Sequence, residues 1–179
     1  MIFRTMLVWL RRNGPRLQKH DVGRLRLRVL PTDLDVLGHM NNGVYLSIMD
    51  LGRMDLMQRS GSWKALADAG MYPVAANETI SFRKSLQPWQ RFVLETRIVG
   101  YDERAVFIEQ RFVVAGQIFA QGFIRARFLR RSGGTVTIEE LAAVTGTDPS
   151  EVRLPSFLER WAVDVAVPAS RAAAPSHWA

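Results

Sequence analysis

The sequence contains no cysteine among its 179 residues. Disulfide bonds and thiolate metal sites are therefore excluded. Its three histidines, His20, His39 and His177, are scattered, and no two of them have the spacing at which one helix supplies two zinc ligands. We expect neither a bound metal nor a cofactor.

Long apolar runs are also missing. The most apolar stretch, MIFRTMLVWL at the N-terminus, is only about ten residues long and carries Arg4, which is too short for a transmembrane helix. It has no convincing small-residue cleavage site of a secretory signal. With Arg11 and Arg12 behind it, residues 1–22 are expected to form an amphipathic segment. Residues 1–12 can then lie on a membrane surface, or dock on the protein or on another subunit.

The overall composition is that of an ordinary globular domain, with 47% hydrophobic and 23% charged residues. Twenty-four basic residues against 17 acidic ones give a net charge of +7. The basic residues form short clusters spread along the chain, often alternating with apolar ones, as on the solvent face of a strand. We therefore expect no nucleic-acid partner, and a cytoplasmic protein, with peripheral membrane contact as the alternative.

Alternating apolar and polar residues predict a sheet, with strands over residues 23–30, 73–82, 91–99, 106–114 and 117–129. Turns are expected at 101–104 and 115–116. From Val44 the period changes: Tyr45, Ile48, Met49, Gly52 and Leu56 recur at steps of three and four, which predicts a helix ending near Ser60. Asn41 or Asn42 is its expected N-cap. Shorter helices are predicted over 62–70, 138–144 and 155–165.

Segregated helices and a run of strands with tight connections indicate an α+β fold. The simplest way to bury both apolar faces is to wrap one curved antiparallel β-sheet around one long central helix, the arrangement called a hotdog fold. We expect this domain over residues 23–131. It follows the N-terminal segment 1–22, and it precedes a helical extension over 132–167 and a disordered tail over 168–179.

A polar segment, DLDVLGHMNNGVY over residues 33–45, lies immediately before the long helix. With the residues that follow, it resembles the D-x-D-x-x-G-H-x-N-N-x-x-Y signature of acyl-CoA thioesterases related to 4-hydroxybenzoyl-CoA thioesterase. YPVAANETISFRKSLQPWQRFVLETRIVGYDER and AVFIEQRFVV resemble later strands of that family. The resemblance covers roughly residues 23–131. It is closest to the thioesterase-like branch that includes thioesterase superfamily member 6.

The resemblance implies hydrolysis of an acyl-CoA to a carboxylic acid and CoA. Asp35 would act as nucleophile or general base. Backbone N–H groups of Asn42 and Gly43, at the positive end of the helix dipole, would hold the oxyanion. His39 is either a general base or an organiser of the loop, and Asp33 is expected to be a loop residue. Gly38 would allow a loop conformation that a side chain would hinder.

Asp50, in the middle of the predicted helix, is a competing catalytic carboxylate, since another hotdog branch uses a mid-helix acid. Arg53 can instead hold it in an ion pair. Acyl-CoA contacts are assigned to Asn41 and Tyr45 and, for the phosphates, to Arg83, Lys84 and Arg91, with Arg125 and Arg127 as weaker candidates. Tyr45 can equally be a packing residue. Pocket length depends on the orientation of five side chains: Met49, Met54, Met57, Trp63 and Trp89.

The resemblance also implies a homodimer or homotetramer, built by pairing edge strands, with active sites between subunits. Two alternatives to the enzyme stay open. One is a non-catalytic protein that binds acyl-CoA or acyl-carrier protein on the same fold, since a fold does not determine function. The other is a membrane-surface protein that acts mainly through its N-terminal segment.

Overall fold

The computed structural model describes residues 14–168 and 172–176. Residues 1–13 of the predicted amphipathic segment 1–22, and residues 169–171 and 177–179 of the predicted disordered tail, lie outside the described residues. The described elements follow one another in this order: β1 (Gly23–Arg28), η2 (Pro31–Asp33), α2 (Asn42–Arg59), α3 (Ser62–Asp68), β2 (Met71–Phe82), β3 (Arg91–Tyr101), β4 (Ala105–Val114), β5 (Gln117–Arg130), α4 (Ile138–Thr145), η3 (Pro149–Glu151) and α5 (Ser156–Asp164).

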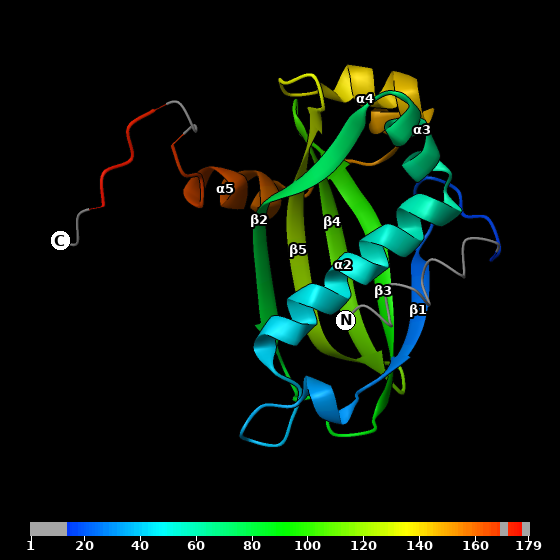
Figure 1. Ribbon diagram of the computed structural model, residues 1–179, viewed down its shortest axis with the longest axis vertical. Coiled ribbons are helices and arrows are strands. Elements are labelled where there is room, and N and C mark those ends of the chain that lie inside the picture. The colour runs from blue at the N-terminus through cyan, green and yellow to red at the C-terminus, as the bar shows by residue number, and fades with distance from the viewer. Residues whose placement is uncertain (1–13, 169–171, 177–179) are drawn as a thin grey trace.

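One five-stranded antiparallel sheet, in the order β1-β3-β4-β5-β2, supports the molecule. β1 pairs with β3 (Gly23 opposite Thr96), and β2 pairs with β5 at the other edge (Met71 opposite Arg130). Two elements adjacent in sequence, α2 and α3, thus connect strands at opposite edges of the sheet. α2 crosses the concave face diagonally from the β2 side to the β1 side (Figure 1). The predicted hotdog fold and its α+β class are confirmed.

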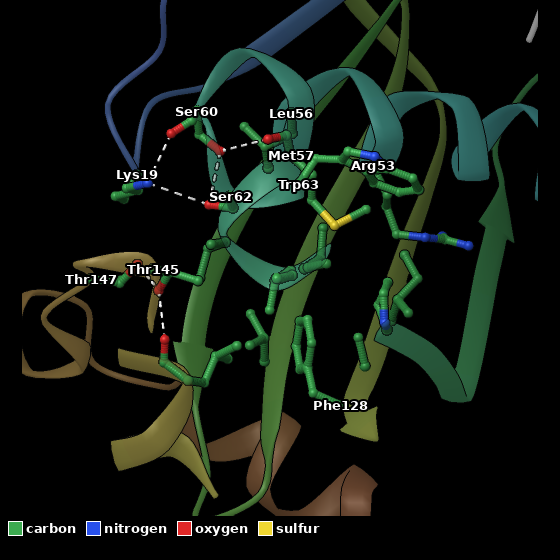
Figure 2. A pocket seen from close by; sticks show the side chains of 18 of the residues that line it. Lys19, Arg53, Leu56, Met57, Ser60, Ser62, Trp63, Phe128, Thr145 and Thr147 are labelled. Atoms are coloured by element: carbon green, nitrogen blue, oxygen red, sulfur yellow. Dashed lines mark hydrogen bonds between the residues drawn. The ribbon is translucent and has the colours of Figure 1, made fainter. Parts of the chain in front are cut away.

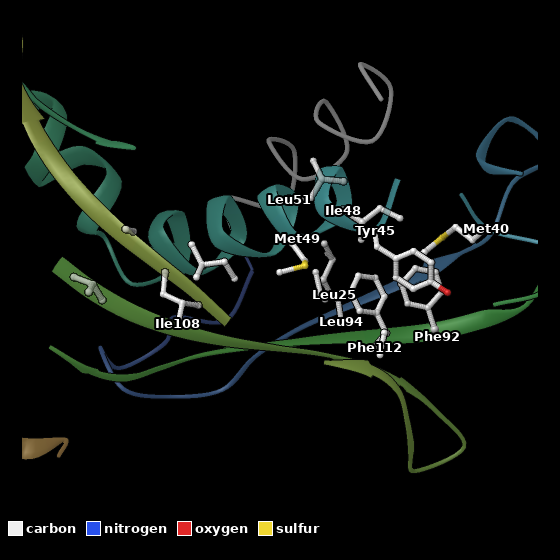
Figure 3. Close-up of a cluster of buried hydrophobic side chains, with 14 of the residues drawn as sticks. Leu25, Met40, Tyr45, Ile48, Met49, Leu51, Phe92, Leu94, Ile108 and Phe112 are labelled. Carbon is white, nitrogen blue, oxygen red and sulfur yellow. The ribbon is translucent and has the colours of Figure 1, made fainter. Parts of the chain in front are cut away.

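The main core lies between α2 and the sheet. Tyr45, Ile48 and Met49 point from α2 toward Leu94 and Phe112 of the central strands (Figure 3). Tyr45 packs edge-on against Phe112, with ring centroids 4.8 Å apart, and against Phe82 at 5.0 Å. These residues follow the predicted period of three and four, so the apolar stripe of α2 faces the sheet as expected.

α2 approaches the sheet most closely at Gly52. A Cβ atom at this position would lie 2.5 Å from Leu94 Cδ2, 2.5 Å from Thr96 Oγ1 and 2.7 Å from Gln110 Nε2. The Gln110 side chain is fully buried, and its amide donates to the Met49 carbonyl and to Thr96 Oγ1, each at 2.9 Å. Only a residue without a side chain fits between the helix and this polar link.

The other face of the sheet carries a smaller cluster. Leu154 and Leu158, before and within α5, pack against Val99, Ala105 and Phe107 of the strands. The predicted helices over 138–144 and 155–165 correspond to α4 and α5. α4 and α3 lie together at the upper end of the sheet, whereas the 31–41 loop and the β2–β3 connection lie at the lower end (Figure 1).

We predict that Gly52→Ala lowers the free energy of unfolding by about 1–3 kcal/mol, because the new methyl group must push α2 away from well-packed neighbours. Chemical denaturation of the purified protein measures this loss. Ser47→Ala, one turn earlier on the same helix, serves as control and should change stability by less than about 0.5 kcal/mol. Equal stability of Gly52→Ala and wild type would contradict the close approach.

Glu109, on the face of β4 opposite α2, should make stability depend on pH. Its side chain is only 4% exposed and accepts hydrogen bonds from Arg97 (2.6 Å), Arg111 (2.6 Å) and Gln121 (2.5 Å). Burial by itself would raise the pKa of Glu109, but these bonds to the ionised form outweigh it and lower the pKa below its ordinary value of 4.5. A lowered folded-state pKa stabilises the protein above the unfolded-state value, and this stabilisation is lost as the pH falls through the folded-state value.

We therefore expect Glu109→Gln to be about 1–3 kcal/mol less stable than wild type at neutral pH. The difference should shrink as the pH falls below 4.5, the ordinary pKa. Urea unfolding over a pH series measures it, with the exposed Glu159→Gln as control. A difference that does not vary with pH would exclude the ionised carboxylate as its source.

Candidate active site

The segment from Leu34 to Met40 folds back on itself in front of α2. Leu34 and Met40 form an isolated antiparallel bridge, and inside it the Asp35 N–H donates to the His39 carbonyl at 3.0 Å. The chain reverses at Gly38, whose φ of +78° is strained for a side-chain-bearing residue, and the Gly38 N–H donates to the Asp35 carbonyl at 3.0 Å. The predicted need for glycine at this turn is thus explained.

The Asp35 carboxylate has a hydrogen bond on one oxygen and a histidine close to the other. Its Oδ1 accepts a hydrogen bond from the Leu37 N–H at 2.9 Å, and its Oδ2 lies 3.5 Å from His39 Nδ1. The Asp35 side chain is 21% exposed, so it is partly withdrawn from solvent yet accessible. An ionised carboxylate in this setting is oriented by the loop and keeps lone pairs free for a reactant.

The His39 ring lies next to the Asp35 carboxylate. Its Nδ1 atom is buried and makes no hydrogen bond to any residue that the structure describes, and it lies 3.5 Å from the Asp35 carboxylate. A modest rotation of either side chain would close the 3.5 Å gap to a hydrogen bond. The arrangement allows His39 to restrict the orientation of the Asp35 carboxylate.

Asp33, the other aspartate of the motif, holds the loop together. It is 5% exposed, its Oδ2 accepts from the Leu30 N–H at 2.7 Å, and its carbonyl accepts from the Asn41 N–H at 2.8 Å. These bonds join the end of β1 to the start of α2. Asp33 therefore has the loop role that the sequence predicted.

In the first turn of α2, one backbone N–H is bonded to the N-cap side chain and another remains available among the described residues. Asn41 is the N-cap, and its Oδ1 accepts from the Gly43 N–H at 2.8 Å. The Asn42 N–H has no hydrogen-bond partner within the described part of the chain. Of the two predicted oxyanion donors, Gly43 is thus already engaged, while Asn42 offers an N–H at the positive end of the helix dipole.

Tyr45 is a packing residue in this structure. Its side chain is 1% exposed, and its hydroxyl accepts from the Leu86 N–H at 3.1 Å. Burial raises the pKa of Tyr45, and that hydrogen bond opposes the rise. Leu86 also accepts from the Met40 N–H at 2.9 Å, so the β2–β3 connection is fastened to the loop that carries Asp35.

Three of the five predicted phosphate-binding cations lie around the β2–β3 connection, at the end of the sheet where the Asp35 loop lies (Figure 1). Arg83 and Lys84 follow β2 and are exposed, as is Arg91 at the start of β3. Lys84 Nζ lies 3.2 Å from Gln117 Oε1 and 5.5 Å from the Phe119 ring centroid. Arg125 instead binds Asp102, at 2.7 Å, near the β3–β4 turn at the opposite end, and Arg127 neighbours it on β5.

Asp50 is bound by Arg53, as its sequence spacing suggested. Arg53 also contacts Glu78 of β2 at 2.8 Å and donates to Gln110 Oε1 at 3.0 Å. Arg53 thus ties α2 to the sheet, and Asp50, whose side chain is 68% exposed, is the outer member of this network. Its contacts are those of an ion pair on a helix surface.

A cavity of about 510 Å³ lies alongside α2, between that helix and the sheet (Figure 2). Met54, Met57 and Trp63 line it, as three of the five candidate pocket residues. Met49 is buried in the core, and Trp89 lies exposed before β3. Lys19 and α4 also line the cavity. Neither was predicted to line a pocket, because both are distant in sequence from the motif.

Two further findings concern the described residues alone. Within 14–168 and 172–176, no three His, Asp or Glu side chains are grouped so that they could hold a metal ion. Among the helices in those ranges, none has both the length and the apolar character required to span a bilayer.

The family follows from comparison with known proteins. A model of the thioesterase-like superfamily matches residues 29–162. The chain belongs to this superfamily. It is 40% identical over 99 residues to Protein THEM6 of Xenopus laevis, covering 55% of this chain and 48% of that protein. The chain spans about half the length of the curated relatives it matches first.

Solved structures share the fold. The YbaW probable thioesterase of Escherichia coli superimposes with a TM-score of 0.64 at 20% identity, over 68% of this chain and 94% of that one. A putative oleoyl thioesterase of Lactobacillus plantarum gives a TM-score of 0.66 at 17% identity, over 76% of this chain and 54% of that one. The resemblance inferred from residues 23–131 is confirmed, and the family match continues past residue 131 into the helical extension.

Asn41→Ala should lower the free energy of unfolding by about 0.5–2 kcal/mol, because it removes the side chain that caps α2. Thermal or urea unfolding measures this loss. The matched control is Asn42→Ala, which changes an exposed side chain at the next position, keeps the backbone N–H, and should cost less than about 0.5 kcal/mol. A larger loss at Asn42 than at Asn41 would contradict the assignment of the cap.

Proposed function

We propose that the protein is an acyl-CoA thioesterase, which converts an acyl-CoA and water to a carboxylic acid and CoA. The observation that carries this proposal is that one short loop holds the Asp35 carboxylate just before the first turn of α2, where the Asn42 N–H has no partner among the described residues. A carboxylate and an oxyanion donor are the two groups that acyl transfer needs. Membership of the thioesterase-like superfamily supports the same reaction.

In this proposal the thioester carbonyl oxygen faces the Asn42 N–H, and the carbonyl carbon faces Asp35. Asp35 Oδ2 either attacks the carbon directly or removes a proton from an attacking water molecule. The C–S bond then breaks, and CoA leaves as the thiolate, which takes up a proton. After direct attack, water hydrolyses the resulting anhydride and restores the carboxylate. An oxyanion donor of this kind typically contributes about 3–4 kcal/mol of barrier lowering.

His39 is a positioning residue here. Because Asp35 Oδ1 is held by the Leu37 N–H, the proximity of His39 Nδ1 to Oδ2 limits the remaining rotation of the carboxylate. Asn41 contributes indirectly: its side chain engages Gly43, so that Asn42 supplies the free N–H. The proposal therefore favours Asn42 over Gly43 as oxyanion donor.

The CoA phosphates would be met by the exposed Arg83, Lys84 and Arg91, which follow β2 or begin β3. The β2–β3 connection lies at the same end of the sheet as the 31–41 loop (Figure 1). Guanidinium groups pair well with phosphate oxygens. Asn41, exposed at the start of α2, can contact the pantetheine arm or the thioester. Tyr45 is almost fully buried, so it would not contact the substrate and would stabilise the site by packing below the loop.

A homodimer, or a homotetramer made of two dimers, is part of the proposal. β2 is an edge strand of 12 residues that pairs only with β5 among the described strands. A long unpaired edge is a template for a second strand. Pairing of two β2 edges would bring a second copy close to the N-terminal half of α2, which crosses the sheet on this side.

The test is release of CoA from a panel of short, long, branched and aromatic acyl-CoAs. A thiol reagent suits this protein because the chain itself has no cysteine. We expect Asp35→Asn to lower kcat/KM by at least about a thousandfold, since it removes the proton acceptor and nucleophile at once. Asp50→Asn should stay within about tenfold of wild type.

If Asp50→Asn loses activity and Asp35→Asn does not, the catalytic carboxylate is Asp50, in the middle of α2. Binding of acyl-CoA without turnover of any member of the panel would instead identify a non-catalytic acyl-CoA-binding protein.

A further inference from the structure

The cavity beside α2 has many apolar lining residues, Lys19 and hydroxyl groups at one end, and the ion-paired Asp50 and Arg53 elsewhere in its wall. Its wall runs along α2 from Ser47 to Ser60, which at 1.5 Å per residue is about 20 Å. Met54, Met57, Ile108 and Phe128 are among its apolar lining residues. An extended alkyl chain advances about 1.3 Å per bond, so roughly 15 bonds would span this length. The shape and lining suit an unbranched chain.

The polar end is formed by Lys19 and the hydroxyl groups of Ser62, Thr145 and Thr147 (Figure 2). Lys19 Nζ donates to the Ser60 carbonyl at 2.8 Å and lies 3.4 Å from Ser62 Oγ. Thr145 and Thr147 bond to each other at 2.8 Å. These contacts use two of the three N–H donors of Lys19, and one remains.

The charge of Lys19 is not balanced by a carboxylate in the described residues. No ion pair of Lys19 is found there, and the two acids of the adjoining loop have other partners: Asp148 accepts from Ser150, and Glu151 contacts His20 at 2.8 Å. Lys19 is half-buried, and burial lowers its pKa. An anionic ligand could take the remaining donor of Lys19 in a charge-assisted hydrogen bond without displacing a carboxylate of the described residues.

We propose that the cavity binds an alkyl carboxylate, with the chain among the apolar residues and the carboxylate on Lys19. The carboxylate can belong to a free fatty acid. It can also be the distal carboxylate of a dicarboxylic acyl thioester whose thioester lies at the start of α2. The cavity begins near the first turn of α2, because Ser47 lines it and the Ser47 Oγ donates to the Gly43 carbonyl at 3.2 Å. Binding of a free carboxylate does not depend on hydrolysis.

The first experiment is calorimetric titration of the full chain with dodecanoate and with 1-dodecanol, which share a chain and differ in charge. We expect wild type to bind dodecanoate at least about tenfold more tightly than the alcohol, as one charged hydrogen bond predicts. Lys19→Met should abolish that difference. Lys64→Met, which changes an exposed lysine of α3 paired with Asp68, should preserve it.

A second pair of variants tests the cavity itself. Ala142 lines the cavity from α4, whereas its neighbour Ala143 is exposed. Ala142→Trp should abolish binding of both probes, and Ala143→Trp should leave it unchanged, with thermal unfolding confirming that both variants are folded. Equal affinity of wild type for the two probes, no binding of either, or undiminished binding by folded Ala142→Trp would each overturn the proposal.

The two sources of the carboxylate are separated by comparing dodecanedioyl-CoA with dodecanoyl-CoA as substrates. Faster turnover of the dicarboxylic thioester, lost in Lys19→Met, assigns Lys19 to the distal carboxylate. Equal turnover together with dodecanoate binding assigns the site to a free fatty acid. If neither thioester is cleaved, the proposed hydrolysis fails while the titration still decides the binding site.

Discussion

The close contact between α2 and the sheet at Gly52 is the constraint on which the rest of the structure depends. Without a side chain at this position, the helix backbone comes near enough for Gln110 to bond the Met49 carbonyl. Buried polar groups in such a contact must be fully paired, and Gln110, Thr96 and Arg53 satisfy one another. This contact sets the depth of α2 over the sheet, and with it the height of the cavity beside the helix.

The same helix organises the candidate active site through its first turn. Paired residues of the motif have different tasks. Asp33 holds the loop while Asp35 stays accessible, and the Asn41 side chain caps the helix while the Asn42 N–H has no partner in the described part of the chain. Asp33 and Asn41 make structural hydrogen bonds, and these bonds position Asp35 and the Asn42 N–H. The polar segment that precedes α2 is therefore a helix start and a candidate reaction site at once.

The far end of α2 has its own polar environment. Lys19 bonds the Ser60 carbonyl near the negative end of the helix dipole, where a cation is favoured. An N–H donor thus lies at one end of α2 and Lys19 lies beside the other end, with apolar side chains and the Arg53–Asp50 ion pair between them. Such a surface matches a ligand with a polar group at each end or at one end. Helices α3 and α4 close the cavity over this region, which ties the extension after β5 to the proposed ligand site.

Local patterns in the sequence were sufficient to determine the elements and the motif. The period of Tyr45, Ile48, Met49 and Gly52 identified α2, and the spacing from Asp33 to Tyr45 identified the loop, because both depend on neighbours within a few residues. Tertiary structure alone decided three other matters: the placement of β2 beside β5 at the far edge, the engagement of the Gly43 N–H by Asn41, and the meeting of Lys19 with α3 and α4 around a cavity. Each of these joins groups whose contact depends on chain reversals and packing between elements, which no periodicity along the chain encodes.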